Sequence, residues 1–392
     1  MENLSRFKVL TNLLNEEKCF KMICGAGNED KEYVKKLALV YTLAGAKVLD
    51  VSANVEVVKY ASQGIDLAFE KAKKLNIEIE HRPFIMVSIG MPGDHHVRKS
   101  YIDPLTCISC GLCAPVCPTD AIPYDFHIKD NLEKFISLGG SYEKEDQSKE
   151  IVIKDLCIGC GKCSNICPKD DIIFYRHNDQ ELRDILPKCL EAGAECFELH
   201  AAVDDDEVVM KEWKLLNEIN PQNYNSLCLD RLNLGNLNLE HRIEKAKTIS
   251  KGKLIVQADG YPMSGGQNDN NTTLQAVACA DVINKKFNMR LNRKKDKDAK
   301  AKAQIASTRK YRPHGHKNGV YIVLSGGTNS LSKKLSNDCG VRVNGVAVGT
   351  YARDIIEAQV QNPEFYSNDS IIEEAYKIAK KLVVSNVRSK YE

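Results

Sequence analysis

Short apolar runs alternate with longer amphipathic segments along most of the chain. Each run has the composition of a buried strand, and in the segments between them apolar residues recur every three to four positions. The runs predict strands at 20–24, 47–51, 84–89, 195–200, 223–229, 253–258, 319–324 and 344–348. The segments predict helices at 30–44, 55–75, 179–192, 205–218, 237–250, 272–286, 328–337 and 351–360.

Eight strand–helix units are the number that closes a TIM-type (β/α)8 barrel. We therefore expect an α/β barrel of this type, with an open doubly wound α/β sheet as the alternative. The long gap between the third and fourth strands predicts an inserted module. The expected parts are 1–99 for the first three strands, 100–176 for the module and 177–392 for the last five strands.

Two cysteine runs of identical spacing lie in the predicted insertion. Residues 107–118 read CISCGLCAPVCP, and residues 157–168 read CIGCGKCSNICP. In this C-x2-C-x2-C-x3-C-P spacing, three thiolates bind one [4Fe–4S] cluster and the fourth binds the other cluster. Zinc knuckles, the alternative, pair separate C-x2-C units and do not repeat such a run. The predicted ligands are Cys107, Cys110, Cys113 and Cys167 for one cluster, and Cys157, Cys160, Cys163 and Cys117 for the other.

Residues around these runs complete the pattern of a two-fold ferredoxin-like module. Gly111 and Gly161 leave room for the backbone to fold closely around a cluster. Short return strands are expected at 119–122 and 169–172, one after each run. The insert at 123–149 between the two halves is longer than such a module needs, and its sequence indicates no role.

Polar residues are expected at the carboxyl ends of the barrel strands, where this fold carries its chemistry. Glu198, His200, Asp230 and Asp259 would together resemble an acid–base cluster. Each of them alone is more often a helix cap or part of a rim ion pair. The loop at 260–266 is a candidate cover for this end of the barrel. The other polar strand ends are Asp50, Ser52, Ser88, Arg231 and Gln257.

Glycine-containing turns follow the seventh and eighth predicted strands. In this fold the two corresponding loops commonly bind phosphate, because glycine lets backbone N–H groups approach an anion. The candidate ligands are Gly326, Gly327, Gly349 and Thr350. A flavin mononucleotide phosphate or a phosphorylated substrate would fit there; plain tight turns are the alternative.

Composition narrows the class of protein. The 392 residues are 43% hydrophobic and 28% charged, which excludes disorder for most of the chain. The 15 cysteines are bunched, which favours metal binding in a reducing compartment over a secreted disulfide framework. Neither a long apolar window nor a signal-peptide pattern is present, so we expect a cytoplasmic location without a membrane-spanning segment. Among the other cysteines, Cys24 is the candidate reactive thiol.

Positive charge is concentrated in the segment 290–317. It holds eleven Lys or Arg and two Asp, a net charge of +9, whereas the whole chain carries +2 and the remainder therefore carries −7. A solvated loop is the favoured interpretation, and docking of an acidic protein is the alternative. The segment contains one aromatic residue, Tyr311, which argues against a nucleic-acid partner.

Three parts of the sequence together resemble a known family. They are KMICGAGN at 21–28, the twin cysteine runs, and LSGGTNS with GVAVGTYAR at 324–330 and 345–353. The chain resembles LdpA, the light-dependent-period iron–sulfur family of cyanobacteria. The resemblance implies the eight cysteine ligands above, a cyanobacterial cytoplasm, and transfer of cellular redox state to the circadian clock through contacts with clock proteins. It implies no catalytic residue.

The favoured hypothesis is an iron–sulfur redox protein that senses the cellular or photosynthetic redox state and transmits it to the clock through protein contacts. Its expected redox partners are ferredoxin or quinone-linked pools. The alternative is an oxidoreductase whose ferredoxin module feeds electrons to a flavin or a phosphorylated substrate at the end of the barrel. A simple electron carrier or an assembly factor is a third hypothesis. Catalysis is left open, because the sequence contains no complete catalytic motif.

Overall fold

The chain folds into two compact units. The computed structural model describes residues 2–28, 30–91, 100–102, 107–123, 151–153, 162–169, 173–174, 179–260, 269–291, 309–311 and 319–387. One unit comprises 1–88 and 185–392, and the other comprises 89–184. The boundaries expected at 99/100 and 176/177 stay a prediction.

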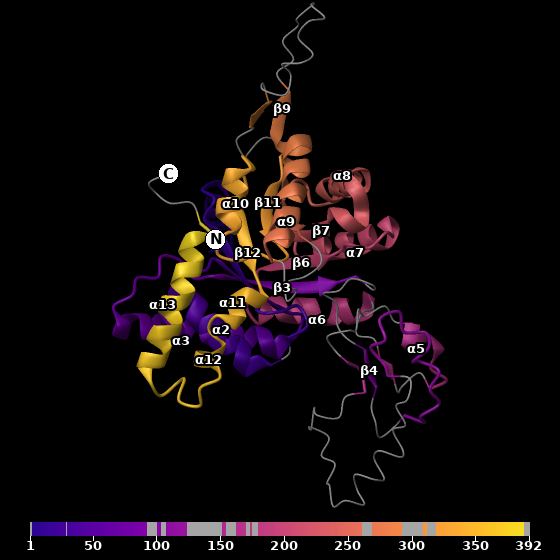
Figure 1. Ribbon diagram of the computed structural model, residues 1–392, viewed down its shortest axis with the longest axis horizontal. Coiled ribbons are helices and arrows are strands. Elements are labelled where there is room, and N and C mark those ends of the chain that lie inside the picture. Colours follow the sequence, from indigo (N-terminus) through magenta and orange to yellow (C-terminus); the bar gives the residue numbers. More distant parts are fainter. Residues whose placement is uncertain are drawn as a thin grey trace, which may run out of the picture. The chain divides into compact units, whose positions relative to one another are not determined.

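The first unit is built on a closed barrel of eight strands, with the order β1-β12-β11-β8-β7-β6-β3-β2 (Figure 1). Neighbouring strands pair in parallel, as in β1 with β12 and β6 with β7. Every predicted strand is present, with its ends shifted by a few residues at most. The TIM-type barrel is thus confirmed, and the open sheet is excluded. The strands are β1 (Cys19–Ile23), β2 (Val48–Ser52), β3 (Phe84–Gly90), β6 (Cys196–His200), β7 (Asn225–Asp230), β8 (Leu254–Asp259), β11 (Tyr321–Ser325) and β12 (Gly345–Val348).

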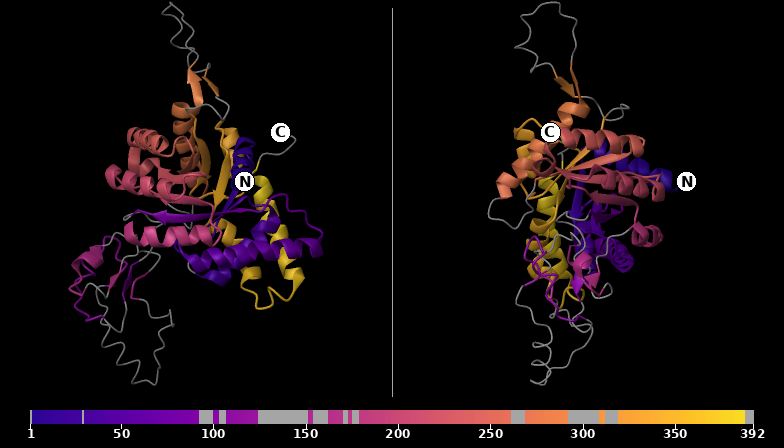
Figure 2. Two further views of the ribbon diagram at one scale, coloured as in Figure 1. Left: turned by 180° about the vertical axis from the view of Figure 1, so that it is seen from behind. Right: turned by 90° about the vertical axis from the view of Figure 1, so that its right-hand side faces the viewer.

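Helices surround these strands (Figures 1 and 2). Within the described part of the chain, none of the helices combines the length and apolar character that crossing a lipid bilayer requires. The helices between and after the strands are α2 (Lys31–Ala44), α3 (Val55–Leu75), α6 (Asp179–Glu191), α7 (Asp206–Ile219), α8 (Arg231–Ile249), α9 (Asp269–Ile283), α10 (Ser332–Asp338), α11 (Thr350–Asp354), α12 (Glu357–Val360) and α13 (Asp369–Ser385).

Local signals explain why the bounds of α2 agree closely with the prediction. The Asp30 side chain accepts a hydrogen bond from the Tyr33 backbone N–H, at 3.0 Å, and so caps the first turn. Gly45 ends the helix with a φ of 95°, a conformation that glycine adopts without a steric penalty. Both signals depend only on neighbouring residues, so the ends of α2 could be predicted from the sequence.

Other helices differ from the prediction. The helix expected from 237 begins at Arg231, because Asp230 caps it, and it is kinked at Gly235, whose φ is 65°. The helix expected at 351–360 is split into α11 and α12. A π-helical turn, η2 (Asn284–Asn288), follows α9 where a continuous helix was expected.

The sequence interpretation missed α1 (Glu2–Asn15), which closes one end of the barrel. Leu10, Leu13 and Leu14 of this helix are buried in one cluster with Val48 and Phe84, which begin β2 and β3. The apolar core of the barrel therefore occupies the amino-terminal half of its interior. The C-terminal helix α13, also missed, packs on α2 outside the barrel.

The ends of the basic segment pair with each other. Strand β9 (Met289–Leu291) is antiparallel to β10 (Arg309–Tyr311), so the segment leaves and returns through a two-stranded ribbon. Most of the solvated loop expected at 290–317, namely 292–308 and 312–317, lies outside the described residues. So does most of the cover loop predicted at 260–266, namely 261–266.

The second unit carries the cysteine runs. Strand β4 (Tyr101–Ile102) pairs antiparallel with β5 (Ile173–Phe174), which begins just after the expected return strand at 169–172. The return strand expected at 119–122 is wrong, since no strand occurs within 107–123; there the Ala121 carbonyl instead accepts a hydrogen bond from the Ile153 N–H, at 2.8 Å. Most of the insert, at 124–149, lies outside the described residues.

Candidate functional site

The first cysteine run forms a loop with tight turns. The N–H of Ala114 bonds to the carbonyl of Gly111, and the N–H of Cys117 bonds to the carbonyl of Ala114. Gly111 has a φ of 75°, a backbone conformation that glycine adopts without a steric penalty. That this glycine also leaves room for the backbone around a cluster stays a prediction.

Backbone N–H groups in this loop point at sulfur. Ser109 donates to Cys107 Sγ at 3.4 Å, and Ala121 donates to Cys117 Sγ at 3.2 Å. Burial opposes ionisation of Cys117, but hydrogen bonds from Thr119, Ala121 and Ile122 outweigh it and lower its pKa. At Cys117 these hydrogen bonds thus stabilise negative charge on sulfur.

The second run is described only in its latter part. Cys163 lies on α5 (Lys162–Ile166), where it is buried and donates to Ser100 Oγ at 3.3 Å. Cys167 follows this helix and is partly buried. The predicted ligands Cys157 and Cys160 lie outside the described residues, as does Gly161.

Sulfur atoms from both runs lie close to one another. Burial raises the pKa of Cys107, and the nearby thiols of Cys110 and Cys167 raise it further. Burial raises the pKa of Cys113 to about 11, and Cys163 is among the thiols that add to this. An apolar core formed by Ile102, Ala114, Ala121, Ile122, Ile151, Val152 and Cys163 lies against four of the other cysteines, Cys107, Cys113, Cys117 and Cys167.

This donor set fits an iron–sulfur cluster. Iron–sulfur clusters take thiolate ligands, and N–H bonds to sulfur together with an apolar surround tune their potentials. The described loops supply all of these features.

The barrel holds a second group of chemically active side chains, which we call the barrel interior cluster: Lys21, Asp50, Glu198, His200, Cys228, Gln257 and Asp259. Lys21 Nζ lies 2.7 Å from Asp50 Oδ2, 2.6 Å from Glu198 Oε2 and 2.9 Å from Gln257 Oε1. Burial alone would lower the pKa of Lys21, but the two carboxylates raise it above its ordinary value. Lys21 is therefore a buried ammonium ion.

The remaining members lie toward the carboxyl ends of the strands. His200 Nε2 lies 3.4 Å from Glu198 Oε1, and Cys228 Sγ lies 3.7 Å from Asp259 Oδ2. Gln257 Nε2 donates to Cys228 Sγ at 3.4 Å. The interior thus changes from an apolar half near α1 to a polar half near the other end.

Most of the predicted strand-end residues meet in this cluster, but three do not. Asp230 caps α8 by accepting from the Asn233 N–H at 2.7 Å. Ser52 donates to the Asn28 carbonyl at 2.8 Å, and Arg231 begins α8. Ser88 does contact the cluster, since its hydroxyl donates to Asp50. The helix-cap interpretation therefore holds for Asp230.

Neither Lys21 nor Cys228 was singled out from the sequence. A lysine in the middle of the run FKMIC was the available signal, because a charged residue inside a strand with buried neighbours needs a partner. The signal for Cys228 was not local, since its neighbours are fixed by strand register.

Close packing excludes any larger residue at the two glycine positions after β11. A Cβ at Gly326, whose φ is 72°, would lie 2.3 Å from Asp259 Oδ1, and one at Gly327 would lie 2.3 Å from Thr272 Cβ. Gly349 differs, because a Cβ there would make only ordinary contacts, the nearest at 3.5 Å. The phosphate site proposed for these turns stays a prediction.

A cation lies beside the turn after β12. Arg353 donates to Thr350 Oγ1 at 3.2 Å and to the Ile23 carbonyl at 3.1 Å. This guanidinium was not among the predicted residues. It adds positive charge next to Gly349 and Thr350, whereas Asp259 places a carboxylate against Gly326.

The expectation of a reactive Cys24 is not supported by its surroundings. Its side chain is fully buried, and burial, followed by the neighbouring Asp50 carboxylate, raises its pKa to about 12. A reactive cysteine needs a thiolate near neutral pH, so Cys24 belongs to the core.

Two family models match the cysteine-rich region. A model described as a 4Fe-4S double cluster binding domain matches residues 106–170, and one described as a 4Fe-4S dicluster domain matches residues 149–199. These matches agree with the thiol-rich loops of the second unit.

Two curated proteins are similar to parts of the chain. Light dependent period A of Synechococcus elongatus is 39% identical over 105 residues, which cover 26% of this chain and 28% of that protein. A ferredoxin of Mycolicibacterium smegmatis is 35% identical over 48 residues, which cover 12% of this chain and 45% of the ferredoxin. Each match thus spans less than half of the relative's length.

Solved structures are similar only at low levels. The YdjI aldolase of Escherichia coli K12 has a TM-score of 0.41 at 7% identity, covering 95% of this chain and 92% of its own. A thiamine phosphate pyrophosphorylase of Pyrococcus furiosus has a TM-score of 0.33 at 11% identity, covering 94% and 98%. The barrel is therefore established by its own strand order. The barrel and the family models together show an iron–sulfur protein, similar over part of its length to Light dependent period A, in which a ferredoxin-type module is inserted into a TIM-type barrel.

Proposed function

We propose that the second unit binds two [4Fe–4S] clusters whose ligands cross between the two cysteine runs. One cluster takes Cys107, Cys110, Cys113 and Cys167, and the other takes Cys157, Cys160, Cys163 and Cys117. The observation that carries the proposal is the packing of cysteines from both runs against one apolar core. Cys107, Cys113 and Cys117 of the first run and Cys167 of the second run lie against this core, which also contains Cys163.

Clusters of this type exchange single electrons when bound. The protein's own contribution is to hold the sulfur ligands and to set their surroundings. Hydrogen bonds from the N–H groups of Ser109 and Ala121 stabilise negative charge on sulfur, and the apolar core limits access of water on one side. Both effects act on the reduction potential.

Three exposed apolar side chains favour exchange of electrons with a protein partner. Ile108, Leu112 and Ile166 are each 43–47% exposed, and each is adjacent in sequence to a ligand proposed for the first cluster. Exposed apolar groups beside a redox centre suit a transient docking surface. The proposed partners are ferredoxin or quinone-linked pools.

We further propose that the protein acts as a redox sensor. Oxidation state would change the affinity of the protein for clock proteins, in the cytoplasm where its thiols stay reduced. The similarity to Light dependent period A supports this proposal, since the name of that relative refers to a period that depends on light. The test measures binding of purified clock proteins to the oxidised and the dithionite-reduced protein. Equal affinities in both states would exclude signalling by redox state.

The clusters themselves are tested by oxygen-free purification. About eight irons and eight acid-labile sulfides per chain are expected, with signals of reduced [4Fe–4S] clusters in electron paramagnetic resonance spectra. Colourless protein that holds zinc in the cysteine runs would overturn the proposal.

A second candidate is an oxidoreductase in which the module feeds electrons to a flavin or a phosphorylated substrate. The charged barrel interior cluster favours it, because a barrel that serves only as a scaffold does not need a buried Lys21 between two carboxylates. The proposed anion ligands are Gly326, Gly327, Gly349 and Thr350, with Arg353 beside them. Flavin extraction and binding of flavin mononucleotide and phosphate to wild type and Arg353→Leu test this candidate. This candidate would be excluded if the purified protein contained no flavin, and if wild type and Arg353→Leu bound flavin mononucleotide and phosphate equally weakly.

A further inference from the structure

Two adjacent strands place three metal-binding side chains together in the barrel interior. Glu198 and His200 are two residues apart on β6 and therefore face the same side of the strand. His200 is the register partner of Cys228 on β7, so both side chains lie at the same level. One ligand atom from each of the three lies within 4.8 Å of the other two, and all three residues are buried.

The carboxylates of Asp50 and Glu198 share one ammonium ion, that of Lys21, and all three side chains are buried. Two buried carboxylates beside a single cation favour the binding of further positive charge. A divalent metal ion next to Glu198 would supply it.

One oxygen atom is suitably placed to bind it. Lys21 contacts Glu198 through Oε2, and Oε1 is turned toward His200. Within the described residues Oε1 accepts no hydrogen bond, although the side chain is fully buried. A metal ion between Glu198, His200 and Cys228 would use this oxygen without displacing Lys21.

We propose that Glu198, His200 and Cys228 bind one zinc ion in the barrel interior. A mixed set of carboxylate oxygen, imidazole nitrogen and thiolate sulfur is typical of Zn²⁺, whereas Mg²⁺ and Ca²⁺ take oxygen ligands. Three protein ligands leave the fourth tetrahedral position for water or for an oxygen atom of a substrate, as in catalytic zinc sites.

Neighbouring residues support the ligands. Gln257 donates to Cys228 Sγ, and this hydrogen bond favours the thiolate that zinc requires. Asp259 Oδ2 lies 3.7 Å from the same sulfur and accepts the hydrogen bond of the Cys228 thiol, so it could take the proton that Cys228 must lose to bind a metal ion. The site differs from the cysteine runs in its donors and belongs to the other unit, so it does not depend on the proposed clusters.

Metal analysis of the intact protein tests the proposal. Protein purified without oxygen, exposed to equimolar zinc and desalted is expected to retain about one zinc per chain in addition to its cluster iron. His200→Asn and Cys228→Ser should each bind zinc at least about tenfold more weakly, with iron unchanged. The matched controls are His241→Asn, at an exposed histidine, and Cys279→Ser, at a buried cysteine of α9, and both should retain the metal.

Zinc-edge X-ray absorption of the wild-type protein gives a test that needs no variant. The proposal predicts one sulfur ligand at about 2.3 Å and two or three nitrogen or oxygen ligands at about 2.0 to 2.2 Å. Failure to retain zinc, or zinc retained equally by all variants, would overturn the site. Zinc with four sulfur ligands and a matching loss of iron would place the metal in the cysteine runs, and this result would contradict both the zinc site and the proposed clusters. Absence of zinc with a full complement of iron would contradict only the zinc site.

Discussion

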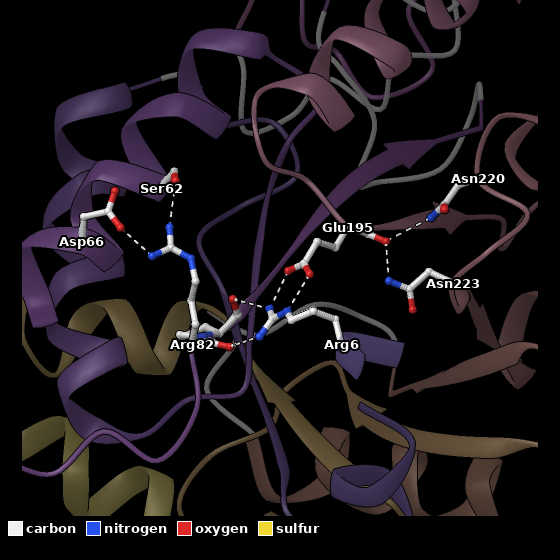
Figure 3. A network of polar contacts seen from close by, with 8 residues as sticks. Arg6, Ser62, Asp66, Arg82, Glu195, Asn220 and Asn223 are labelled. Carbon is white, nitrogen blue, oxygen red and sulfur yellow. Dashed lines mark hydrogen bonds and ion pairs between the residues drawn. The ribbon is translucent and has the colours of Figure 1, made fainter. Parts of the chain in front are cut away.

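The guanidinium of Arg6 on α1 forms two hydrogen bonds with the carboxylate of Glu195, at 2.8 and 2.6 Å (Figure 3). The same guanidinium donates to the carbonyls of Arg82 and Pro83 and lies over the ring of Phe84. Arg82 and Pro83 precede β3, and Glu195 precedes β6. These strands are neighbours in the barrel and flank the inserted module in sequence, so Arg6 holds together the amino-terminal ends of the two strands between which the module is inserted.

Arg6→Ala should therefore destabilise the barrel. We expect a loss of about 2 kcal/mol in the free energy of unfolding, since charged hydrogen bonds in a partly buried site disappear. Denaturant unfolding followed by circular dichroism measures it. Arg6→Lys keeps the positive charge but cannot form the bidentate hydrogen bonds, so it should recover less than half of the lost free energy of unfolding. Full recovery by lysine would show that charge alone matters.

Acid stability should depend on Glu17, which lies between α1 and β1. Burial would raise its pKa, but Lys333 at 2.9 Å and Arg342 outweigh burial and lower it below the ordinary value of 4.5. A lowered pKa contributes stability that is present above the ordinary value and is lost as the pH falls through the folded value.

Glu17→Gln should consequently lower the free energy of unfolding by about 3 kcal/mol near neutral pH, because Lys333 loses its buried partner. Thermal unfolding of variant and wild type should be compared over a pH series, and the two should converge only once the pH falls below the lowered pKa of Glu17 in the folded protein. A constant difference down to strongly acidic pH would contradict this role of the Glu17 charge.

The two glycine turns should respond differently to alanine. Gly326→Ala forces a left-handed backbone on alanine and a clash with Asp259, and we expect a loss of about 2 kcal/mol or more. Gly349→Ala meets only ordinary contacts with the described residues and should therefore destabilise the barrel less than Gly326→Ala does. Melting temperatures of both variants provide the measurement, and equal effects would refute the packing explanation. Gly349 is thus the position at which anion binding can be tested without unfolding.

Cysteine labelling should separate buried from exposed thiols. Cys24 has a pKa raised to about 12 and no exposed surface, whereas Cys339 is exposed. In native protein at mildly alkaline pH, a maleimide should modify Cys339 and leave Cys24 unmodified until the chain is unfolded. Peptide mass spectrometry identifies the sites. Rapid native labelling of Cys24 would mean that the end of β1 opens.

The barrel could be predicted from sequence because its signals are local. The apolar strand runs and the caps at Asp30 and Gly45 depend on neighbouring residues. Helix α1 carries no comparable cap signal, and its role appears only when Leu10, Leu13 and Leu14 meet the strands that follow. The spacing of the cysteine runs is also a local pattern, and for that reason it indicates thiolate ligands on its own.

The barrel interior cluster could be predicted only in part. Glu198 and His200 were marked as strand-end residues, but their proximity to Lys21 and Cys228 is set by strand register. Register depends on the closed sheet and not on any local pattern. The sequence thus indicated polar residues at this end of the barrel without indicating which of them would meet.

The crossing of ligands between the two cysteine runs is tested most directly by iron counts in two paired variants. Replacing Cys107 and Cys167 together removes ligands from one cluster if the ligands cross, so about four irons per chain should remain. Replacing Cys107 and Cys117 together should then remove both clusters and leave almost no iron. The opposite pattern, with iron lost from the first pair and about four irons kept by the second, would mean that each run binds its own cluster.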